Sequence, residues 1–406
     1  MGSFVPTTPS ERQQMLKTIG VGSVEELFRD VPQEMRIDGY LDLPSGKSEM
    51  ETLESVSALA EKNHVFRTCL RGAGSYRHYI PAAVKAIVNR EEFVTAYTPY
   101  QAEISQGILQ AIFEYQTMLC ELTGMDVSNA CVYDGGTAAA ESITMCRDRK
   151  RTKAYVSATT DPQVIEVMKT YCFGSDVELT VVPQKNGRTD PEALRSLLGQ
   201  DAACFYVQQP NFYGLLEEAE LLGEITHAAG AKYVMGVNPI SLAILKTPAE
   251  CGADVAVGEG QPLGLDTAFG GPYLGFMTAS SAMMRKLPGR IVGQTVDTEG
   301  EIGYVLTLSA REQHIRREKA SSNICSNEQL CAFTAAVYLS AMGEKGLRQA
   351  ATLCTSKAHY FAQQLEEKLG WKRVHPGEFF HEFVTECPDT EKALAALAKR
   401  DILGGL

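Results

Sequence analysis

From residue 153 to residue 257, short and almost continuously apolar segments alternate with segments that begin like helices. A strand that is apolar on both sides needs cover on both faces, and this is typical of a parallel sheet between two layers of helices. We therefore predict a doubly wound α/β domain with a mainly parallel sheet. The predicted strands lie at about 153–159, 177–183, 203–208, 233–237 and 254–257, and the predicted helices at about 162–173, from 191 onward and at 218–229.

The helix starts in this region carry a specific signal. Asp161-Pro162 and Asp190-Pro191 each place a carboxylate directly before a proline. The carboxylate can accept hydrogen bonds from free backbone N–H groups, and proline is tolerated at the first helical position because no N–H partner is needed there. Gly230 is placed to end the third helix.

The first 65 residues predict a separate helical arm. Three pairs have capping-box spacing, in which a hydroxyl and a carboxylate each bind a free backbone N–H. The pairs are Thr8 with Glu11, Ser23 with Glu26, and Ser48 with Glu51. We expect three short helices here, followed by the large α/β domain over residues 66–325.

Residues 326–406 predict a small α+β domain. The expected elements are helices from about Asn327 to Met342 and from Gly346 to Leu369, strands at 371–375 and 379–387, and a helix from Asp389. The pattern stops at Leu406 without a closing element. We therefore expect this domain to be truncated.

Composition excludes several classes of function. The 38 basic and 50 acidic residues give a net charge of -12, which repels nucleic-acid phosphates. The 11 cysteines include no Cys-x-x-Cys pair, so neither a disulfide framework nor a zinc site is indicated. No segment approaches the roughly 18 apolar residues of a membrane span, and we expect a cytoplasmic protein with no membrane partner and no metal.

Two glycine-containing segments have unusual chemistry. Asp134 is followed by Gly135, Gly136 and Thr137, a pattern that places free N–H groups at a helix start. It fits a phosphate site, and it fits tight packing of the helix against the sheet equally well. The loop at 72–76, Gly-Ala-Gly-Ser-Tyr, begins like a dinucleotide fingerprint but lacks the third glycine.

Two further segments concentrate polar groups. Tyr97, Tyr100, Gln101 and Glu103 offer several hydrogen-bonding side chains within seven residues. On spacing alone, a surface turn before the helix through residues 109–116 is the favoured interpretation. The charged residues at 311–319 are typical of a solvated helix face.

Taken together, these segments resemble one family, the α-type P-proteins of the glycine cleavage system. The strings that carry the resemblance lie at 72–81, 97–106, 133–138, 258–261, 269–272 and 311–319. The resemblance covers nearly the whole chain. It implies an aminotransferase-like fold (fold type I of the pyridoxal phosphate enzymes), with an N-terminal helical arm and a small C-terminal α+β domain.

The resemblance also implies an activity and partners. An α2β2 assembly, in which only the β chain (glycine dehydrogenase subunit 2) holds pyridoxal phosphate, decarboxylates glycine. It then passes the aminomethyl group to the lipoyl arm of the lipoylated H-protein. The implied enzyme is glycine dehydrogenase (aminomethyl-transferring).

Two residue positions agree with a chain that does not hold the cofactor. Enzymes of this fold bind it through a lysine, yet no lysine occurs between Lys246 and Lys286, and Gln261 and Pro262 occupy that place. A glutamine amide is not a nucleophilic amine. Met235 stands where an aspartate would pair with the pyridinium nitrogen.

We therefore expect a partner subunit that completes the active site of the β chain. The residues expected to be lent to that site are Tyr97, Tyr100, Gln101 and Glu103, with Gly74, Ser75 and His78 beside them. The turn at Gly135, Gly136 and Thr137 becomes a vestigial phosphate loop, filled by side chains or solvent. Two alternatives stay open: an autonomous pyridoxal phosphate enzyme that uses Lys319, and a non-catalytic scaffold.

Overall fold

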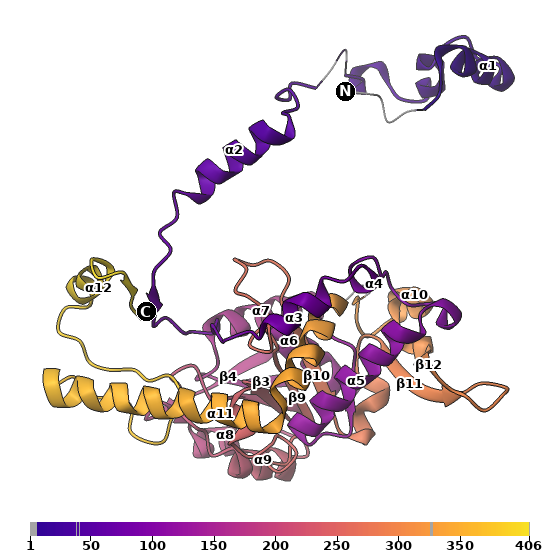
Figure 1. Cartoon of the computed structure of the whole chain (residues 1–406). Coiled ribbons are helices and arrows are strands. Elements are labelled where there is room, and N and C mark those ends of the chain that lie inside the picture. The colour runs from indigo at the N-terminus through magenta and orange to yellow at the C-terminus, as the bar shows by residue number, and fades with distance from the viewer. Residues whose placement is uncertain (1–5, 38, 40, 325–327, 406) are drawn as a thin grey trace. The chain divides into compact units, whose positions relative to one another are not determined.

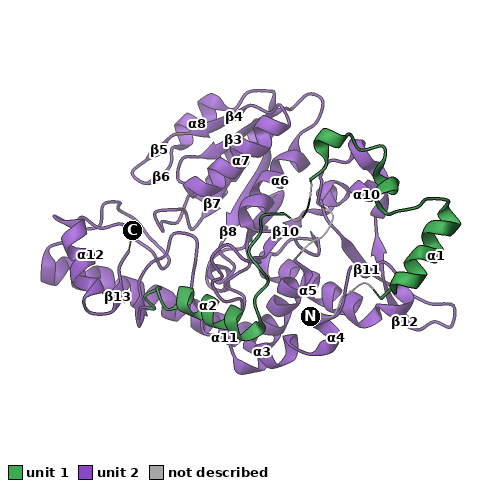
Figure 2. Cartoon of the chain, turned by 90° about the horizontal axis from the view of Figure 1, so that it is seen from above, with its two compact units in different colours: residues 1–65 green, residues 66–406 purple. Residues whose placement is uncertain are grey.

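The computed structural model describes residues 6–37, 39, 41–324 and 328–405, in two compact units, Met1–Val65 and Phe66–Leu406 (Figure 2). The predicted boundary between residues 325 and 326 falls inside the second unit and stays a prediction.

The described residues of the first unit form two α-helices, α1 (Pro9–Ile19) and α2 (Glu49–Ala60), and two short 3-10 helices, η1 (Glu25–Phe28) and η2 (Gln33–Met35). Both α-helices begin at a complete capping box, with Thr8 and Ser48 as the capping residues. The remaining predicted pair, Ser23 with Glu26, lies at the short 3-10 helix η1 instead of an α-helix. There the Glu26 N–H donates to the Ser23 hydroxyl over 3.4 Å.

The second unit is built on a seven-stranded sheet in the order β2-β10-β9-β8-β7-β3-β4 (Figure 1). Strands β9, β8, β7, β3 and β4 run parallel, and β10 runs antiparallel to both β9 and β2. The mainly parallel doubly wound sheet is therefore confirmed. The strands are β2 (Val127–Ser128), β3 (Lys153–Ser157), β4 (Leu179–Val182), β7 (Ala202–Gln209), β8 (Lys232–Val237), β9 (Val255–Glu259) and β10 (Gly275–Ala279).

Helices cover both faces of this sheet, and side-chain alternation along the strands separates two cores. In β7, Phe205 and Val207 join the core under α5, α9 and α11, whereas Cys204 and Tyr206 join the core under α6 and α7. The main helices are α5 (Gln106–Thr123), α6 (Gly135–Cys146), α7 (Pro162–Gly174), α8 (Pro191–Leu197), α9 (Ala219–Ala228) and α11 (Gln329–Leu369). Asp161 and Asp190 cap α7 and α8, as the sequence predicts.

Shorter elements complete the second unit. The small strands pair as β1 (Thr68–Cys69) with β13 (Ile402–Leu403), β5 (Gln184–Lys185) with β6 (Arg188–Thr189), and β11 (Ile291–Val296) with β12 (Ile302–Thr307). The remaining helices are α3 (Ala82–Val88), α4 (Glu91–Val94), η3 (Ala102–Ile104), η4 (Ser241–Ala243), η5 (Ser281–Lys286), η6 (Ser309–Arg311), α10 (Gln313–Arg316), η7 (Arg317–Lys319) and α12 (Thr390–Ala398).

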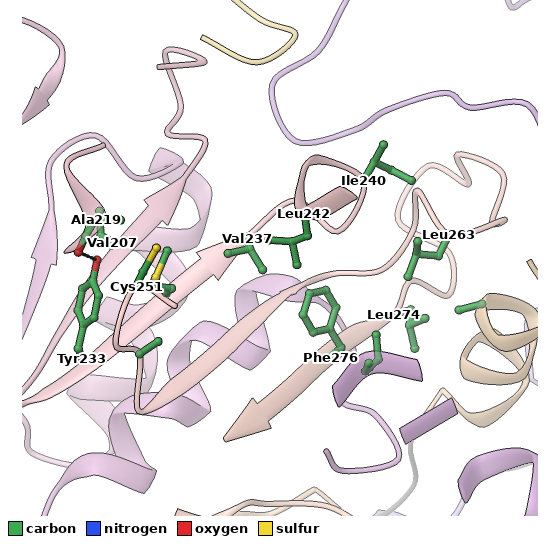
Figure 3. Close-up of a cluster of buried hydrophobic side chains, with 14 of the residues drawn as sticks. Val207, Ala219, Tyr233, Val237, Ile240, Leu242, Cys251, Leu263, Leu274 and Phe276 are labelled. Carbon is green, nitrogen blue, oxygen red and sulfur yellow. Dashed lines mark hydrogen bonds between the residues drawn. The ribbon is translucent and has the colours of Figure 1, made fainter. Parts of the chain in front are cut away.

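The first core continues across the strands β7, β8 and β10. Tyr233 from β8 is fully buried, and its hydroxyl donates to the Ala219 carbonyl over 2.8 Å (Figure 3). Phe276 from β10 and Leu242 from η4 belong to the same core. Burial of each large apolar side chain contributes roughly 1.5–3 kcal/mol, so this core holds the strand ends in place.

One prediction for the C-terminal part is confirmed and one needs correction. The two predicted helices are present, because a kink with non-helical backbone at Gly343 divides α11 into two helices, and the predicted start at Asn327 lies outside the described residues. The segments 371–375 and 379–387 share only an isolated bridge between Arg373 and Thr385. The bridge consists of two hydrogen bonds, from the Val374 N–H to the Val384 carbonyl and from the Glu386 N–H to the Lys372 carbonyl, over 2.9 Å each, which is too short a pairing for two strands. The Phe380 N–H, earlier in the second segment, donates to the Gly214 carbonyl instead.

The ten described cysteines are all free thiols, and Cys325 lies outside the described residues. Most of the ten are at least partly buried. Within the described part of the chain, no helix is long and apolar enough to cross a membrane.

One carboxyl group in α6 makes the stability of the fold depend on pH. Glu141 is buried against the second core, and burial raises its pKa to about 7, although the Ser322 hydroxyl donates to it over 3.1 Å. The folded state therefore favours the protonated acid. Stability contributed by this group is complete below pH 4.5 and is lost as the pH rises through about 7.

We predict that Glu141→Gln is more stable than the unaltered chain at pH 8, by up to about 3 kcal/mol, because one unit of pKa corresponds to about 1.4 kcal/mol. The difference should vanish as the pH falls below 4.5. Denaturant unfolding at both pH values measures it, with the exposed Glu344→Gln as control. An equal difference at both pH values would contradict a buried, titrating Glu141.

Candidate functional site

The helix start predicted as a phosphate loop exists, and α6 begins there. Asp134 is the N-cap, and its carboxylate accepts from the Thr137 N–H over 2.7 Å. The Ala138 N–H donates to the Asp134 carbonyl over 2.9 Å. Some of the backbone N–H groups at the start of α6 are therefore already bound by other groups of this chain.

A second carboxylate closes this turn. Glu259, the last residue of β9, accepts from the N–H groups of Gly135 over 2.9 Å, Gln261 over 2.9 Å and Leu274 over 3.0 Å. A Cβ at position 135 would lie 2.9 Å from the Cβ of Glu259, so glycine is required for this approach. Burial raises the pKa of Glu259, while its three N–H donors act in the opposite direction.

These residues do not fit the phosphate of a cofactor. A phosphate at the start of α6 would lie beside the carboxylates of Asp134 and Glu259, which repel it and already use N–H groups that it would need. In this turn the Gly135 N–H is bound by Glu259 and the Thr137 N–H by Asp134.

Gln261 uses its side chain to hold neighbouring backbone. It is 2 % exposed; its carbonyl oxygen accepts from the Tyr76 N–H over 3.3 Å, and its amide nitrogen donates to the Leu265 carbonyl over 2.7 Å. Pro262 is buried beside it. The predicted lysine position is therefore occupied by an amide that links the loop at 72–76 to the end of β9.

The glycine-rich loop at 72–76 also binds a carboxylate of this chain. Glu382 accepts from the Ala73 N–H over 2.7 Å and from the Tyr76 hydroxyl over 2.6 Å. A Cβ at Gly72 would lie 1.9 Å from a Glu382 oxygen, which explains the glycine. Burial raises the pKa of Glu382, and the hydrogen bonds from Tyr76 and Ala73 oppose this.

Of the residues expected beside the partner's site, Gly74 and Ser75 are exposed and His78 is half-buried. His381 stacks obliquely on Tyr76, with ring centroids 4.7 Å apart. Burial lowers the pKa of both His78 and His381 to about 4, so both imidazoles are neutral at pH 7.

The loop at 97–103 presents its polar groups to the surface. Tyr97 is 80 % exposed, Tyr100 is 50 % exposed, and Gln101 and Glu103 are exposed. Beside Tyr97 lies a cavity of about 230 Å³ between this loop, α5 and the start of α11. Burial and the nearby Asp134 carboxylate raise the pKa of Glu328 in the cavity wall.

The loop also contacts the segment expected to be a solvated helix face. The ring centroids of Tyr100 and His314 lie 5.8 Å apart. In addition, the Tyr100 hydroxyl oxygen accepts a hydrogen bond from an Arg290 nitrogen over 2.8 Å. The expectation for 311–319 is wrong at its start, because Glu312 is buried and Arg311 donates to backbone carbonyls, including that of Gly289 over 2.6 Å.

Sequence reasoning assigned no role to three residues that bind the candidate site residues: Glu259, Glu382 and Arg290. Arg290 had a usable signal, a lone charge between Gly289 and Ile291 in an otherwise apolar segment. The two glutamates had no local signal.

The glycine cleavage system P-protein family matches residues 2–405 of this chain. A relative from Carboxydothermus hydrogenoformans, named probable glycine dehydrogenase (decarboxylating) subunit 1, is 50% identical over 99% of this chain and 91% of its own length. A relative of the same name from Moorella thermoacetica is 51% identical over 98% of this chain and 89% of its own length.

A solved structure is similar over the same extent. The glycine decarboxylase (P-protein) of the glycine cleavage system, in inhibitor-bound form, superimposes with a TM-score of 0.90 at 43% identity, covering 99% of this chain and 92% of that one. An alanine–glyoxylate aminotransferase from Nostoc sp. gives a TM-score of 0.56 at 17% identity, covering 84% and 86%. This second likeness confirms the aminotransferase-like fold alone.

We predict that the isolated chain does not bind pyridoxal phosphate, because two carboxylates lie at the α6 turn and Lys319 is exposed rather than enclosed in a pocket. Titration followed by absorbance, with borohydride reduction and mass spectrometry, measures this. A saturable site with micromolar affinity, or a lysine adduct, would show that the chain holds the cofactor itself.

We also predict that Glu259→Ala lowers the free energy of unfolding by more than about 2 kcal/mol, because unpaired buried N–H groups cost about 1–3 kcal/mol each. Glu259→Gln keeps a carbonyl acceptor and should cost less. Thermal and denaturant unfolding measure the loss, with the exposed Glu344→Ala as the matched control. Equal stability of the two alanine variants would exclude Glu259 as the link between α6, β9 and β10.

Proposed function

Because this chain belongs to the glycine cleavage system P-protein family, we propose that it is the α-type subunit of a glycine decarboxylase and acts only with a partner that holds pyridoxal phosphate. The relatives are named subunit 1, which implies a second subunit. That second subunit is the β chain of an α2β2 assembly.

The Glu259 carboxylate in the α6 turn is the observation that carries this proposal. It uses the N–H of Gly135, and Gln261 stands in place of a nucleophilic amine. The Glu259 carboxylate at the α6 turn and the glutamine at position 261 each remove a contact that the cofactor would need, while the surrounding fold is kept. They support a division of labour in which the β chain holds the cofactor, which supplies an electron sink for decarboxylation.

The contribution of this chain comes from its exposed loop at 97–103. Tyr97 and Tyr100 offer phenolic donors, Gln101 offers an amide, and Glu103 offers a carboxylate. Phenol and amide donors suit the carboxylate of glycine, and a carboxylate suits its ammonium group. The loop thus binds and orients glycine across the subunit interface, with Gly74, Ser75 and His78 beside it.

The complete reaction involves one more partner. The assembly decarboxylates glycine and transfers the aminomethyl group to the lipoyl arm of the H-protein. In this proposal the present chain supplies binding groups and no covalent chemistry.

Two other functions are weaker. An autonomous enzyme would need Lys319, which is exposed within a charged segment and has no apolar pocket. A purely structural scaffold is consistent with the filled turn but leaves the exposed polar loop without a role. The turnover of the β chain alone separates the scaffold from the shared site, because a full rate without this chain supports the scaffold.

We predict that Tyr97→Phe and Glu103→Ala each lower glycine–bicarbonate exchange by the reconstituted pair by about 10- to 100-fold, because a hydrogen bond to a charged group contributes about 1.5–3 kcal/mol. Both side chains are exposed, so the melting temperature of the isolated chain should not change. Tyr360→Phe, an equally conservative change of an exposed tyrosine on α11, is the control. Full activity of both loop variants would remove the loop from the shared site.

A further inference from the structure

The cavity beside the loop at 97–103 has apolar walls and one carboxylate. Its volume is about 230 Å³, and it lies between the segment that follows α4, helix α5 and the start of α11. Phe93 and Phe333 line it and stack on each other, with ring centroids 3.9 Å apart. The apolar lining also includes Ile108, Ala111, Ile112 and Leu330.

The carboxylate in this wall belongs to Glu328, the N-cap residue of α11. Glu328 is half-buried, and its side chain accepts no hydrogen bond from the backbone of the described chain. Burial and the Asp134 carboxylate raise its pKa, and no donor or basic group among the described residues acts in the opposite direction. A carboxylate that loses hydration without gaining a partner is costly. The described chain therefore leaves this negative charge uncompensated.

We propose that this cavity binds a primary ammonium group carried on a short aliphatic chain. The apolar wall suits the carbon chain, and the Glu328 carboxylate suits an ammonium group, which has three N–H donors and no acceptor. A water molecule takes about 30 Å³ in the liquid, so a cavity of about 230 Å³ has room for a short chain. An aliphatic acid would instead be repelled by Glu328.

The helix dipole alone explains only part of this arrangement. The start of α11 favours a negative charge, which accounts for a carboxylate at position 328. It does not account for the space beside that carboxylate. Ala96 and Ala111 line the cavity, and larger apolar side chains at these positions would occupy it. The combination of an unpartnered charge and an adjoining apolar space is explained by a ligand that has both a cation and a carbon chain.

The proposed function supplies a ligand of this class, and this step rests on it. Tyr97, from the loop proposed to bind glycine, lines the same cavity. Glycine has a carboxylate of its own, which Glu328 repels. The aminomethyl group on the lipoyl arm has an ammonium end, an aliphatic carrier and no carboxylate. The cavity therefore receives the aminomethyl group after its transfer to the arm.

Titration of the isolated chain with butylammonium chloride tests the binding, at pH 8 and constant ionic strength, by ligand-observed NMR. We expect one saturable site with a Kd in the millimolar range, as is usual for a ligand of this size. Butan-1-ol has a matching chain without the charge, and glycine has the ammonium without the chain. Each should bind about ten-fold more weakly or not at all, because a hydrogen bond between charged groups is lost or a repulsion is added.

Three variants locate the site. Glu328→Gln removes the charge and should weaken butylammonium binding about ten-fold or more. Ala111→Leu fills the cavity and should weaken it while every charge is kept. Glu344→Gln, an equally conservative change of an exposed glutamate further along α11, is the matched control and should leave the Kd unchanged. Circular dichroism shows whether each variant is folded.

The reconstituted pair separates two sources of the ammonium group, the carrier arm and a lysine side chain of the partner. Butylammonium should bind the pair as it binds the isolated chain, because the cavity stays open to the arm. Glu328→Gln should then lower transfer of the aminomethyl group to the H-protein about ten-fold. Loss of butylammonium binding in the pair would show that the partner fills the cavity, and it would overturn the assignment to the aminomethyl group.

An unchanged Kd for butylammonium in Glu328→Gln and Ala111→Leu, or equal binding of butan-1-ol, would overturn the ammonium site itself. These outcomes leave the proposed function untouched, because the titration uses no partner and measures no turnover. If butylammonium binds as expected while Tyr97→Phe and Glu103→Ala are fully active, the ammonium site stands. The proposed function then fails, together with the assignment to the aminomethyl group.

Discussion

The site depends on the hydrogen bonds of one carboxylate. Glu259 ends β9 and accepts hydrogen bonds from N–H groups at the start of α6, in the turn after β9 and at Leu274, directly before β10. The two carboxylate oxygens of Glu259 thus join, by hydrogen bonds, three segments that approach one another at the end of the sheet. Because donors at a helix start favour negative charge, the chain satisfies this end with its own side chain. A cofactor phosphate and Glu259 cannot use the same N–H group.

The same solution occurs at the loop over residues 72–76. There Glu382 binds the Ala73 N–H and the Tyr76 hydroxyl, and glycine at position 72 permits the close approach. Buried donors that lack partners are costly, and in both places a carboxylate of this chain accepts from them.

The surface groups are positioned by rigid parts of the fold. The loop at 97–103 is exposed, yet Tyr100 within it is held by Arg290 and His314. Binding groups work best when they are held in the geometry that the ligand needs, because less ordering is required on binding. An exposed loop with one tyrosine fixed from inside is suited to completing a site on another subunit.

The sequence by itself determined the parallel sheet, the helix start after Asp134 and the helix caps at Asp161 and Asp190, because these follow from local periodicity and from chemistry between near neighbours. The family followed from the resemblance of several long strings to known proteins. The sequence also identified the glycine-rich turns. Only the tertiary structure decided which groups bind there: Glu259 lies 124 residues from Gly135, and Glu382 lies 309 from Ala73. The extent of the C-terminal strand pairing was likewise decided by the fold, because backbone at 378–380 pairs with the distant loop at 214–216. Propensity is local, whereas the choice of a partner for a buried polar group depends on which segments the whole fold brings together.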